Sequence, residues 1–382
     1  MHIAYLTPEY PHERTGTSGG MGTSIKNLVS ELVKQNVKVS VFVYGQARDE
    51  FFKEEGVNFY LLKKLKYTFG GFYLYRKHIN LLLDTIIKRE QIDLLEVPDW
   101  TGISAFMKFK IPVVMRFHGS DTYFCHLEGR KQKWKNRFFE KQAVKNSDGY
   151  IAPTRFAGEK SAELFSLKPD KVEIIPYGLQ LDDFINEHPL DYLPFSIVNI
   201  GTLIRKKGVF QLAKIFNAIH KMFPEATLTL IGSDAPDVYT NSSSTWELMQ
   251  KEFTETAFQK VTYKGKVPYA DTQSAIKKAH VCAFPSLAET LGMVTIEAMA
   301  LQKAVVNTNL GWAQDLITDG EDGFLHHPDD IEGQCNSIER LFLNQMLLKN
   351  LGERARKKVE INFNIEELVL RNINLYSKVL NS

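Results

Sequence analysis

The pattern of apolar and polar positions along the chain predicts short buried strands that alternate with amphipathic helices. Residues 1–7 and 37–43 are apolar runs of strand length, and apolar residues recur at helical spacing in the segment 25–33 between them. The same order of strand, loop and helix returns along the rest of the chain. It is typical of parallel sheets that bind ligands where strands end and helices begin.

The most informative stretch is the segment 281–306. A short apolar run is stopped by Pro285, small and polar residues follow, and a helical pattern then leads into a second apolar run. The pattern predicts a strand, a loop, a helix and a strand. Two carboxylates flank the expected corner, Glu289 in the loop and Glu297 about one turn into the helix.

Two interpretations of these carboxylates are open. Ser286 and Glu289 have the S-x-x-E spacing of a capping box, so Glu289 could bond only backbone N–H groups, and Glu297 could be an ordinary exposed residue. Alternatively, the carboxylates accept hydrogen bonds from sugar hydroxyls and the helix start binds phosphate. The backbone groups expected to bind phosphate belong to Leu291, Gly292, Met293 and Val294.

Glu289 and Glu297 are separated by seven residues within E-T-L-G-M-V-T-I-E-A-M-A. This stretch resembles the Glu-x7-Glu motif of retaining glycosyltransferases of family 4, the group 1 enzymes similar to glycogen synthase and sucrose synthase. The resemblance implies the GT-B fold, an α/β architecture of two Rossmann-like parallel-sheet domains that face each other across a cleft. It also implies that Glu289 contacts hydroxyls of the donor sugar and that Glu297 holds the ribose of the nucleotide.

A basic corner is expected in the segment 201–208, between a strand and a helix. Cationic side chains there could neutralise a diphosphate leaving group as the glycosidic bond breaks. Lys207 and Gly208 match the family pattern, but Thr202 stands where the family usually has arginine. Arg205 could reach the phosphates instead. We therefore expect Arg205 and Lys207 to act on the leaving group.

Glycines supply further candidates for donor binding. The resemblance implies that Gly19 and Gly20 lie against the donor diphosphate and that the strand end at Gly265 seats the nucleobase. Gly232 ends another predicted strand of the same half of the chain. A plain turn is the alternative for the amino-terminal loop, which lacks the G-x-G-x-x-G order of a nicotinamide site.

His118 follows the predicted strand 111–117 and resembles the family histidine that lies beside the transferred sugar. A purely structural role is the alternative. Glu96, Asp99 and Trp100 are expected at another strand end, where the ligand crevice should be. Trp100 could stack on a sugar or simply pack on the surface.

Two segments are both basic and aromatic. We expect the segment 51–75 to be a solvated loop, with an insertion facing an acceptor or an anionic surface as the alternative. The segment 129–145 predicts a helix that either lies on an anionic membrane surface or packs on the core. Peripheral membrane contact is therefore an open alternative.

Length and composition favour two domains, because 382 residues with 44% hydrophobic content can fill two cores. We expect an amino-terminal, acceptor-side domain over 1–185 and a donor-side domain over 186–365. A final helix over 366–382 should pack back on the first domain. The 47 basic and 45 acidic residues nearly balance and give no argument for nucleic acid.

Targeting and redox signals are weak. The sequence has no run of 18 apolar residues, and its first predicted strand leaves no room for a signal peptide. Cys125, Cys282 and Cys335 are scattered and show neither disulfide nor metal-ligand spacing. We expect a cytoplasmic protein, with the inner face of the membrane as a further location to test.

The resemblance, taken with these features, implies a retaining hexosyltransferase that moves a sugar from a UDP- or GDP-sugar to a hydroxyl acceptor, a glycan or lipid-linked molecule of the cell envelope. The sequence has no D-x-D triplet, so we expect neither a metal nor a cofactor beyond the donor. The resemblance implies front-face substitution. A nucleotide-sugar-binding protein without turnover is the alternative, because Thr202 replaces the usual arginine. A phosphorylase or hydrolase of nucleotide sugars is a third hypothesis.

Overall fold

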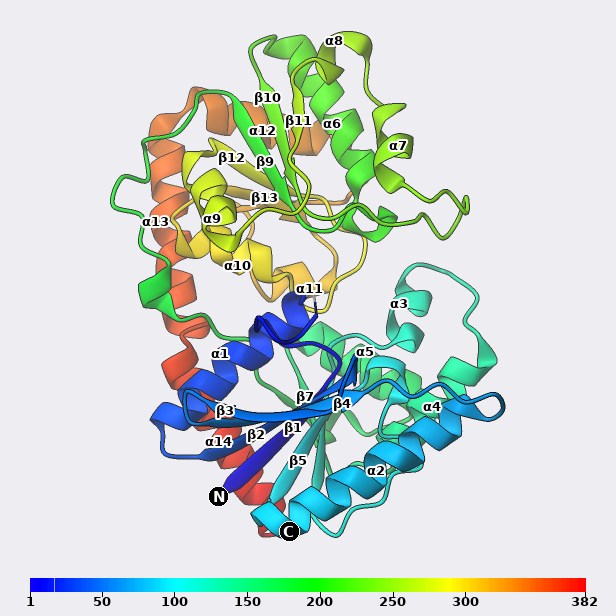
Figure 1. The fold of residues 1–382 in the computed structure, drawn as a ribbon. Coiled ribbons are helices and arrows are strands. Elements are labelled where there is room, and N and C mark those ends of the chain that lie inside the picture. Colours follow the sequence, from blue (N-terminus) through cyan, green and yellow to red (C-terminus); the bar gives the residue numbers. More distant parts are fainter. Residues whose placement is uncertain (17) are drawn as a thin grey trace. The chain divides into compact units, whose positions relative to one another are not determined.

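The computed structural model describes residues 1–16 and 18–382, which divide into two compact units. The first unit is Met1–Gln180 together with Asn364–Ser382, and the second is Leu181–Phe363. Each unit has its own sheet with helices packed on it (Figure 1). The expected α/β class with two parallel-sheet domains is confirmed.

The sheet of the first unit has eight strands in the order β3-β4-β2-β1-β5-β6-β7-β8, and all its pairs are parallel except β3 with β4. The strands are β1 (His2–Thr7), β2 (Lys38–Gln46), β3 (Glu50–Glu54), β4 (Val57–Lys63), β5 (Leu94–Pro98), β6 (Val113–Arg116), β7 (Gly149–Ala152) and β8 (Val172–Ile174). The helices are α1 (Gly20–Lys34), α2 (Gly71–Glu90), α3 (Asp121–Leu127), α4 (Trp134–Lys145), α5 (Arg155–Phe165) and α14 (Ile365–Leu380).

Every residue of β1 is buried, because helices cover both faces of this sheet. Ile3 and Tyr5 pack in a cluster with residues of α1 and α14, whereas Ala4 and Leu6 pack in a second cluster with residues of α2. A strand that is covered on both faces has apolar residues at successive positions, and this run of apolar residues is the sequence pattern that predicted β1.

The hairpin β3–β4 corrects the expectation of a solvated loop over 51–75. Glu55 and Gly56 connect its strands with φ of +48° and +81°, the two left-handed positions of a tight two-residue turn. Phe59 of β4 is buried and stacks on Phe52 of β3 at 4.8 Å. Only the later part of the predicted loop, between β4 and α2, lacks regular structure.

Helix α14 is fixed to the first sheet by a buried polar network. Arg116 on β6 donates two hydrogen bonds to the carboxylate of Glu96 on β5, at 2.7 and 2.9 Å. Tyr376 of α14 donates to the same carboxylate at 2.6 Å, and the amide oxygen of Asn372 accepts from Arg116 at 2.6 Å. The last helix is therefore part of the first unit's core.

The sheet of the second unit has six strands, all paired in parallel, in the order β11-β10-β9-β12-β13-β14. The strands are β9 (Ser196–Ile200), β10 (Thr227–Ile231), β11 (Val261–Tyr263), β12 (Val281–Phe284), β13 (Val305–Thr308) and β14 (Phe324–His326). The helices are α6 (Val209–Met222), α7 (Thr245–Gln250), α8 (Glu255–Phe258), α9 (Tyr269–Lys278), α10 (Met293–Ala300), α11 (Gly311–Gln314), α12 (Ile331–Leu343) and α13 (Gln345–Asn362). Among residues 1–16 and 18–382, every helix is too short or too polar to cross a membrane.

Candidate active site

Two loop corners of the second unit lie side by side because β9 and β12 are neighbouring strands. From β9 the sheet continues through β10 to β11, and from β12 it continues in the other direction through β13 to β14. The carboxyl ends of β9 and β12 therefore flank the point where the strand order reverses. Open α/β sheets bind ligands at this point.

Backbone contacts join the two corners. The N–H groups of Leu287 and Ala288 donate to the carbonyl of Lys206, at 2.7 and 3.2 Å. Gly208 has φ of +69°, and a Cβ atom there would lie 1.8 Å from the carbonyl oxygen of Pro285. Glycine is therefore required where the β9 corner passes the β12 corner.

Glu289 pairs with Lys207 across these corners. The ammonium of Lys207 contacts Oε1 of Glu289, and the hydroxyl of Ser286 lies 3.5 Å from the same oxygen. Helix α10 begins only at Met293, with Gly292 as its N-cap. Glu289 therefore does not cap α10, and its carboxylate pairs with a cation from the neighbouring corner.

Glu297 lies on α10, one turn beyond the helix start, and is 5% exposed. The hydroxyl of Tyr269, the first residue of α9, donates to its Oε1 at 2.9 Å. Burial raises the pKa of Glu297, and the hydrogen bond from Tyr269 partly opposes that rise. At the helix start, Gly292 has φ of +93°, and among the described residues no side chain caps it. Its backbone N–H groups suit an anion.

Glycines line the carboxyl ends of β9, β10 and β11. The N–H of Gly201 donates to Ile231, and the N–H of Gly232 donates to Gly265, both at 2.9 Å. A Cβ on Gly232 would lie 1.9 Å from the carbonyl oxygen of Gly201, whereas one on Gly265 would have no atom within 4 Å. Gly232 thus permits two backbones to approach, and Gly265 leaves open space beside its strand end.

Arg205 lies at the same corner as Lys207 but has a different partner. It donates two hydrogen bonds to the carboxylate of Asp237, each 2.9 Å long, and lies over the rings of Phe210 and Tyr239 at 4.5 and 5.1 Å. These bonds hold the pKa of Asp237 at about 2, below its ordinary value. The structure therefore uses Arg205 to fix the loop after β10.

In the first unit, His118 follows β6 in a tightly bonded turn. Its Nδ1 lies 2.7 Å from the hydroxyl of Tyr177, and the carboxylate of Asp99 accepts the N–H groups of His118 and Gly119 at 2.9 and 3.2 Å. Burial, with a smaller effect of the nearby Arg116 charge, lowers the pKa of His118 to about 3. The imidazole is therefore neutral at physiological pH and can exchange hydrogen bonds but supplies no positive charge.

Gly19 is the N-cap of α1, and Gly20 is its first residue. The carboxylate of Glu9 accepts the N–H groups of Gly19 at 3.1 Å and of Gly22 at 2.8 Å. The helix start expected to face a diphosphate therefore already holds an anionic group of the chain itself.

Comparison with known families accounts for both halves of the chain. Residues 182–358 match the family model described as glycosyl transferases group 1, and residues 18–183 match glycosyltransferase family 4. Both halves of the chain are therefore glycosyltransferase domains. An uncharacterized glycosyltransferase of Methanocaldococcus jannaschii is 25% identical to this one over 347 residues, which cover 89% of each chain.

Solved structures support the same fold for this glycosyltransferase. Sucrose-phosphate synthase from Thermosynechococcus elongatus has a TM-score of 0.83 at 20% identity, covering 100% of this chain and 99% of that one. Anabaena HepE, solved in complex with UDP and glucose, has a TM-score of 0.77 at 15% identity and covers 99% and 100%. The GT-B fold expected from the sequence is confirmed.

The candidate residues of this glycosyltransferase are divided between the two units. Lys207, Glu289 and the start of α10 share one corner of the second unit, with Glu297 one turn along the helix. Arg205 turns to Asp237 at the same corner. His118 and the Gly19–Gly20 pair belong to the first unit.

Glu96 and Asp99, expected beside a ligand crevice together with Trp100, instead make contacts within the first unit. Glu96 is 3% exposed and its carboxylate is consumed by Arg116 and Tyr376, so it stabilises the core. Asp99 is buried and organises the turn at His118. Trp100 remains 40% exposed, so its ring is available at the surface.

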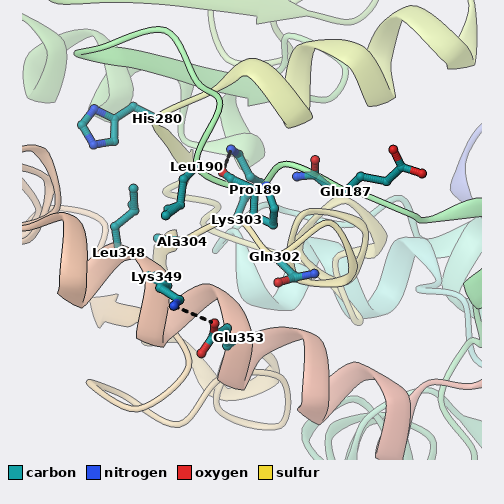
Figure 2. Close-up of a pocket in the computed structure, with 11 residues that line it drawn as sticks. Glu187, Pro189, Leu190, His280, Gln302, Lys303, Ala304, Leu348, Lys349 and Glu353 are labelled. Atoms are coloured by element: carbon teal, nitrogen blue, oxygen red, sulfur yellow. Dashed lines mark hydrogen bonds and ion pairs between the residues drawn. The ribbon is translucent and has the colours of Figure 1, made fainter.

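A cavity of about 260 Å³ lies elsewhere in the second unit (Figure 2). It is lined by residues that directly precede two strands, His280 before β12 and Ala304 before β13, and by Leu348 of α13. It therefore opens at the amino ends of the strands, whereas Glu289 and Lys207 follow the carboxyl ends. The buried ammonium of Lys303 in this cavity donates to the carbonyl of Pro189 at 2.9 Å, which is a structural contact.

Sequence reasoning missed Tyr269, Glu9 and Asp237, which contact the predicted residues. Tyr269 directly follows Val267 and Pro268, a helix-start signal that places its side chain beside the strand ends. Glu9 follows Pro8 at the end of β1, in the loop that leads to the glycines. For Asp237 the polar loop after β10 gave no specific signal.

Proposed function

We propose that this glycosyltransferase is a retaining, metal-independent enzyme that transfers a sugar from a UDP- or GDP-sugar to a hydroxyl acceptor. The observation that carries the proposal is the contact of Lys207 with Glu289 beside the start of α10, which no side chain of the described residues caps. A cation, a sugar-binding carboxylate and a phosphate-binding helix start then lie at one end of one sheet. The complex of Anabaena HepE with UDP and glucose supports a UDP-linked donor.

The proposed reaction is a front-face substitution. The bond from the anomeric carbon to the departing diphosphate oxygen breaks, while the acceptor hydroxyl oxygen bonds to the same face of that carbon. The acceptor proton passes to the departing phosphate. Lys207 and the N–H groups of Gly292, Met293 and Val294 stabilise the growing negative charge.

The carboxylates are assigned different tasks. Glu289, pointing at Lys207, orients the sugar hydroxyls and exchanges its cation with the diphosphate when the donor binds. Glu297, with one oxygen held by Tyr269, accepts hydrogen bonds from the ribose. The nucleobase is assigned to the open strand end at Gly265.

The test compares two variants of the second unit. Glu297→Ala should weaken donor binding, measured by calorimetry with UDP-, GDP- and ADP-sugars, with little change in turnover at saturating donor. Glu289→Ala should mainly lower turnover and leave donor affinity within a few-fold. Wild-type rates in both variants with every donor would refute the assignment. Nuclear magnetic resonance of the product anomer tests retention of configuration.

The second candidate is a nucleotide-sugar-binding protein without turnover. It is favoured by Arg205, which pairs with Asp237 and leaves Lys207 as the cation proposed for the diphosphate. Tight donor binding without transfer or hydrolysis would support it. Release of free sugar in the absence of acceptor would instead indicate a hydrolase.

A cell-envelope glycan or lipid-linked acceptor is proposed from the basic and aromatic segments of the first unit.

A further inference from the structure

Three segments of the first unit that are distant in sequence form one exposed aromatic surface. They are the start of α2, the turn that follows the 3-10 helix η1 (Trp100–Gly102), and α4. We name this surface the aromatic platform, and its exposed rings are Phe69, Phe72, Tyr73, Phe106, Trp134 and Phe138.

Direct ring contacts join three rings of the platform, Tyr73, Phe106 and Phe138. Phe106 lies 5.8 Å from Tyr73 of α2 and 5.9 Å from Phe138 of α4. Trp134 precedes Phe138 by four residues on α4, so both side chains lie on one face of the helix. The two are 72% and 46% exposed, and neither ring is used to fill the core. Figure 1 shows α2 and α4 packed against the same unit.

A buried arginine holds these segments together. Arg76 of α2 is 4% exposed and donates to the carbonyls of Phe72, Thr101 and Gly102, at 3.0, 2.7 and 3.0 Å. Its guanidinium lies 4.6 Å over the ring of Phe139. A Cβ atom on Gly102 would lie 2.5 Å from the backbone of Phe139, so α4 packs directly on the turn. These contacts fix α2, the turn and α4 to one another.

Phe106 is held in an unfavourable backbone conformation. Its φ is +65°, a region that bulky side chains rarely adopt, yet its ring stays 38% exposed. Burial of the ring in the core therefore does not offset this strain. Strain of this kind clusters at sites of contact and function.

The segments that carry the platform also carry exposed basic side chains, and one exposed acid, Asp49, accepts the N–H of Lys63 at 2.8 Å. The segments 63–77, 100–110 and 129–141 contain one acidic residue, Glu140, which is buried and accepts the N–H groups of Asp121 and Thr122. The exposed bases of these segments are Lys63, Lys64, Lys66, Lys77, Lys108, Lys110, Lys131, Lys133, Lys135, Arg137 and Lys141. We call them the basic rim.

We propose that the aromatic platform and its basic rim dock the first unit on anionic membrane lipids, with α4 in the plane of the headgroups. Most of the rings are phenylalanine or tryptophan, which gain by leaving water for the boundary of the acyl chains. The rim attracts the negative surface potential of the membrane. A second copy fits poorly, because two basic rims would repel each other. The proposal does not depend on sugar transfer, since docking needs no donor.

The test is sedimentation of the full chain with vesicles. We expect it to bind vesicles of equal parts phosphatidylcholine and phosphatidylglycerol, to bind phosphatidylcholine alone at least tenfold more weakly, and to be released by high salt. Equal binding to both kinds of vesicle, or none to either, would overturn the proposal.

Paired variants separate the two parts of the surface. Trp134→Ala with Phe138→Ala should weaken binding by at least tenfold, whereas the control Leu343→Ala with Met346→Ala, at residues 65% and 66% exposed on the second unit, should not.

For charge, Lys133→Gln and Lys135→Gln should each cost about fivefold, and the exposed controls Lys214→Gln and Lys221→Gln should cost little. Equal losses in platform and control variants would contradict the assignment. So would sedimentation equilibrium showing platform-dependent self-association, or platform-dependent binding of single-stranded RNA, while vesicles stay unbound.

Discussion

The hydroxyl of Tyr269 is the partner that the structure gives to the buried carboxylate of Glu297. Because this bond favours the ionised form, Tyr269→Phe should raise the pKa of Glu297 further. The variant should bind donor about three- to tenfold more weakly at neutral pH, the loss of about one hydrogen bond. Its affinity should also begin to fall at a higher pH on acidification than that of the parent.

Calorimetric titration of the donor across the acidic range measures both effects. Phe184, which contacts the Tyr269 ring edge-on at 6.4 Å, provides a control, because Phe184→Leu leaves the hydroxyl in place. Identical affinity and pH dependence in Tyr269→Phe and the parent would show that the contact does not orient Glu297 for binding.

The pair of Asp237 and Arg205 predicts a pH-dependent contribution to stability. Asp237 has a folded-state pKa of about 2, below its value in an unfolded chain, so the pair stabilises the fold above about pH 4 and loses this effect as the pH falls to about 2. Asp237→Asn should lower the free energy of unfolding at neutral pH by about 2 kcal/mol. Urea titrations of variant and parent should converge near pH 2, and a constant difference at all pH values would contradict the assignment.

Residue chemistry was predictable where it follows a local motif. Glu289, Glu297 and Lys207 were singled out because the segments around them resemble motifs of family 4 glycosyltransferases, and in the structure Glu289 lies beside Lys207. The partner of Arg205 was not predictable, because Asp237 lies 32 residues away on a loop without a pattern. Arg205 and Asp237 pair because of the path that the loops after β9 and β10 take, and the spacing of apolar residues in the sequence does not predict that path.

At the scale of elements, Gly208 decides how closely the β9 corner approaches the β12 corner. Gly208→Ala would place a Cβ 1.8 Å from the carbonyl of Pro285 and must displace the loop that carries Glu289. We expect a loss of stability of about 2 to 4 kcal/mol, from the strained φ together with the clash, and weaker donor binding.

Gly320→Ala is the matched control for that change. Gly320 has φ of +75°, similar to Gly208, but a Cβ there meets nothing within 4 Å. It should cost about 1 kcal/mol from backbone strain alone. Thermal unfolding and donor titration of both variants measure the difference, and equal losses would show that the approach of the two corners is unimportant.

Elements were predicted best where burial is uniform. Fully buried parallel strands such as β1 and β12 appear as continuous apolar runs, and the alternation with helices gave the fold class. The hairpin β3–β4 was missed because its exposed charges made the segment look solvated. The Glu55–Gly56 turn between two apolar stretches was the available signal.

At the scale of the whole first unit, the network of Glu96, Arg116 and Tyr376 joins the sheet to α14. Arg116→Met should cost about 3 to 5 kcal/mol, because it leaves the Glu96 carboxylate buried without its cation. Glu96→Leu combined with Arg116→Met should be less destabilised than Arg116→Met alone. Hydrogen exchange read separately in the two units measures this, and additive losses would contradict the coupling.

The chain leaves the first unit after Gln180 and returns to it at Asn364, and the residues next to these two points contact each other inside the first unit. The N–H of Ile365 donates to the carbonyl of Leu179 at 3.1 Å, and a Cβ on Gly178 would lie 2.7 Å from Cα of Ile365. The sequence pattern predicted parallel sheets but not the order of the strands within them. It also did not predict this close passage of remote segments, because the passage depends on the packing of α14.

Val369 and Tyr376 of α14 complete the core that also contains Ile3 and Tyr5. The first unit is therefore built from residues that precede the second unit in the sequence and residues that follow it. A ribosome releases residues 365–380 only after all of residues 181–363 have emerged. Residues 1–180 therefore cannot complete their core until α14 has been synthesised, and part of one apolar face of their sheet stays uncovered until then. Residues 181–363 can already fold during that time. Nascent chains halted before α14 should depend on holdase chaperones, and the dependence should vanish once that helix has left the exit tunnel.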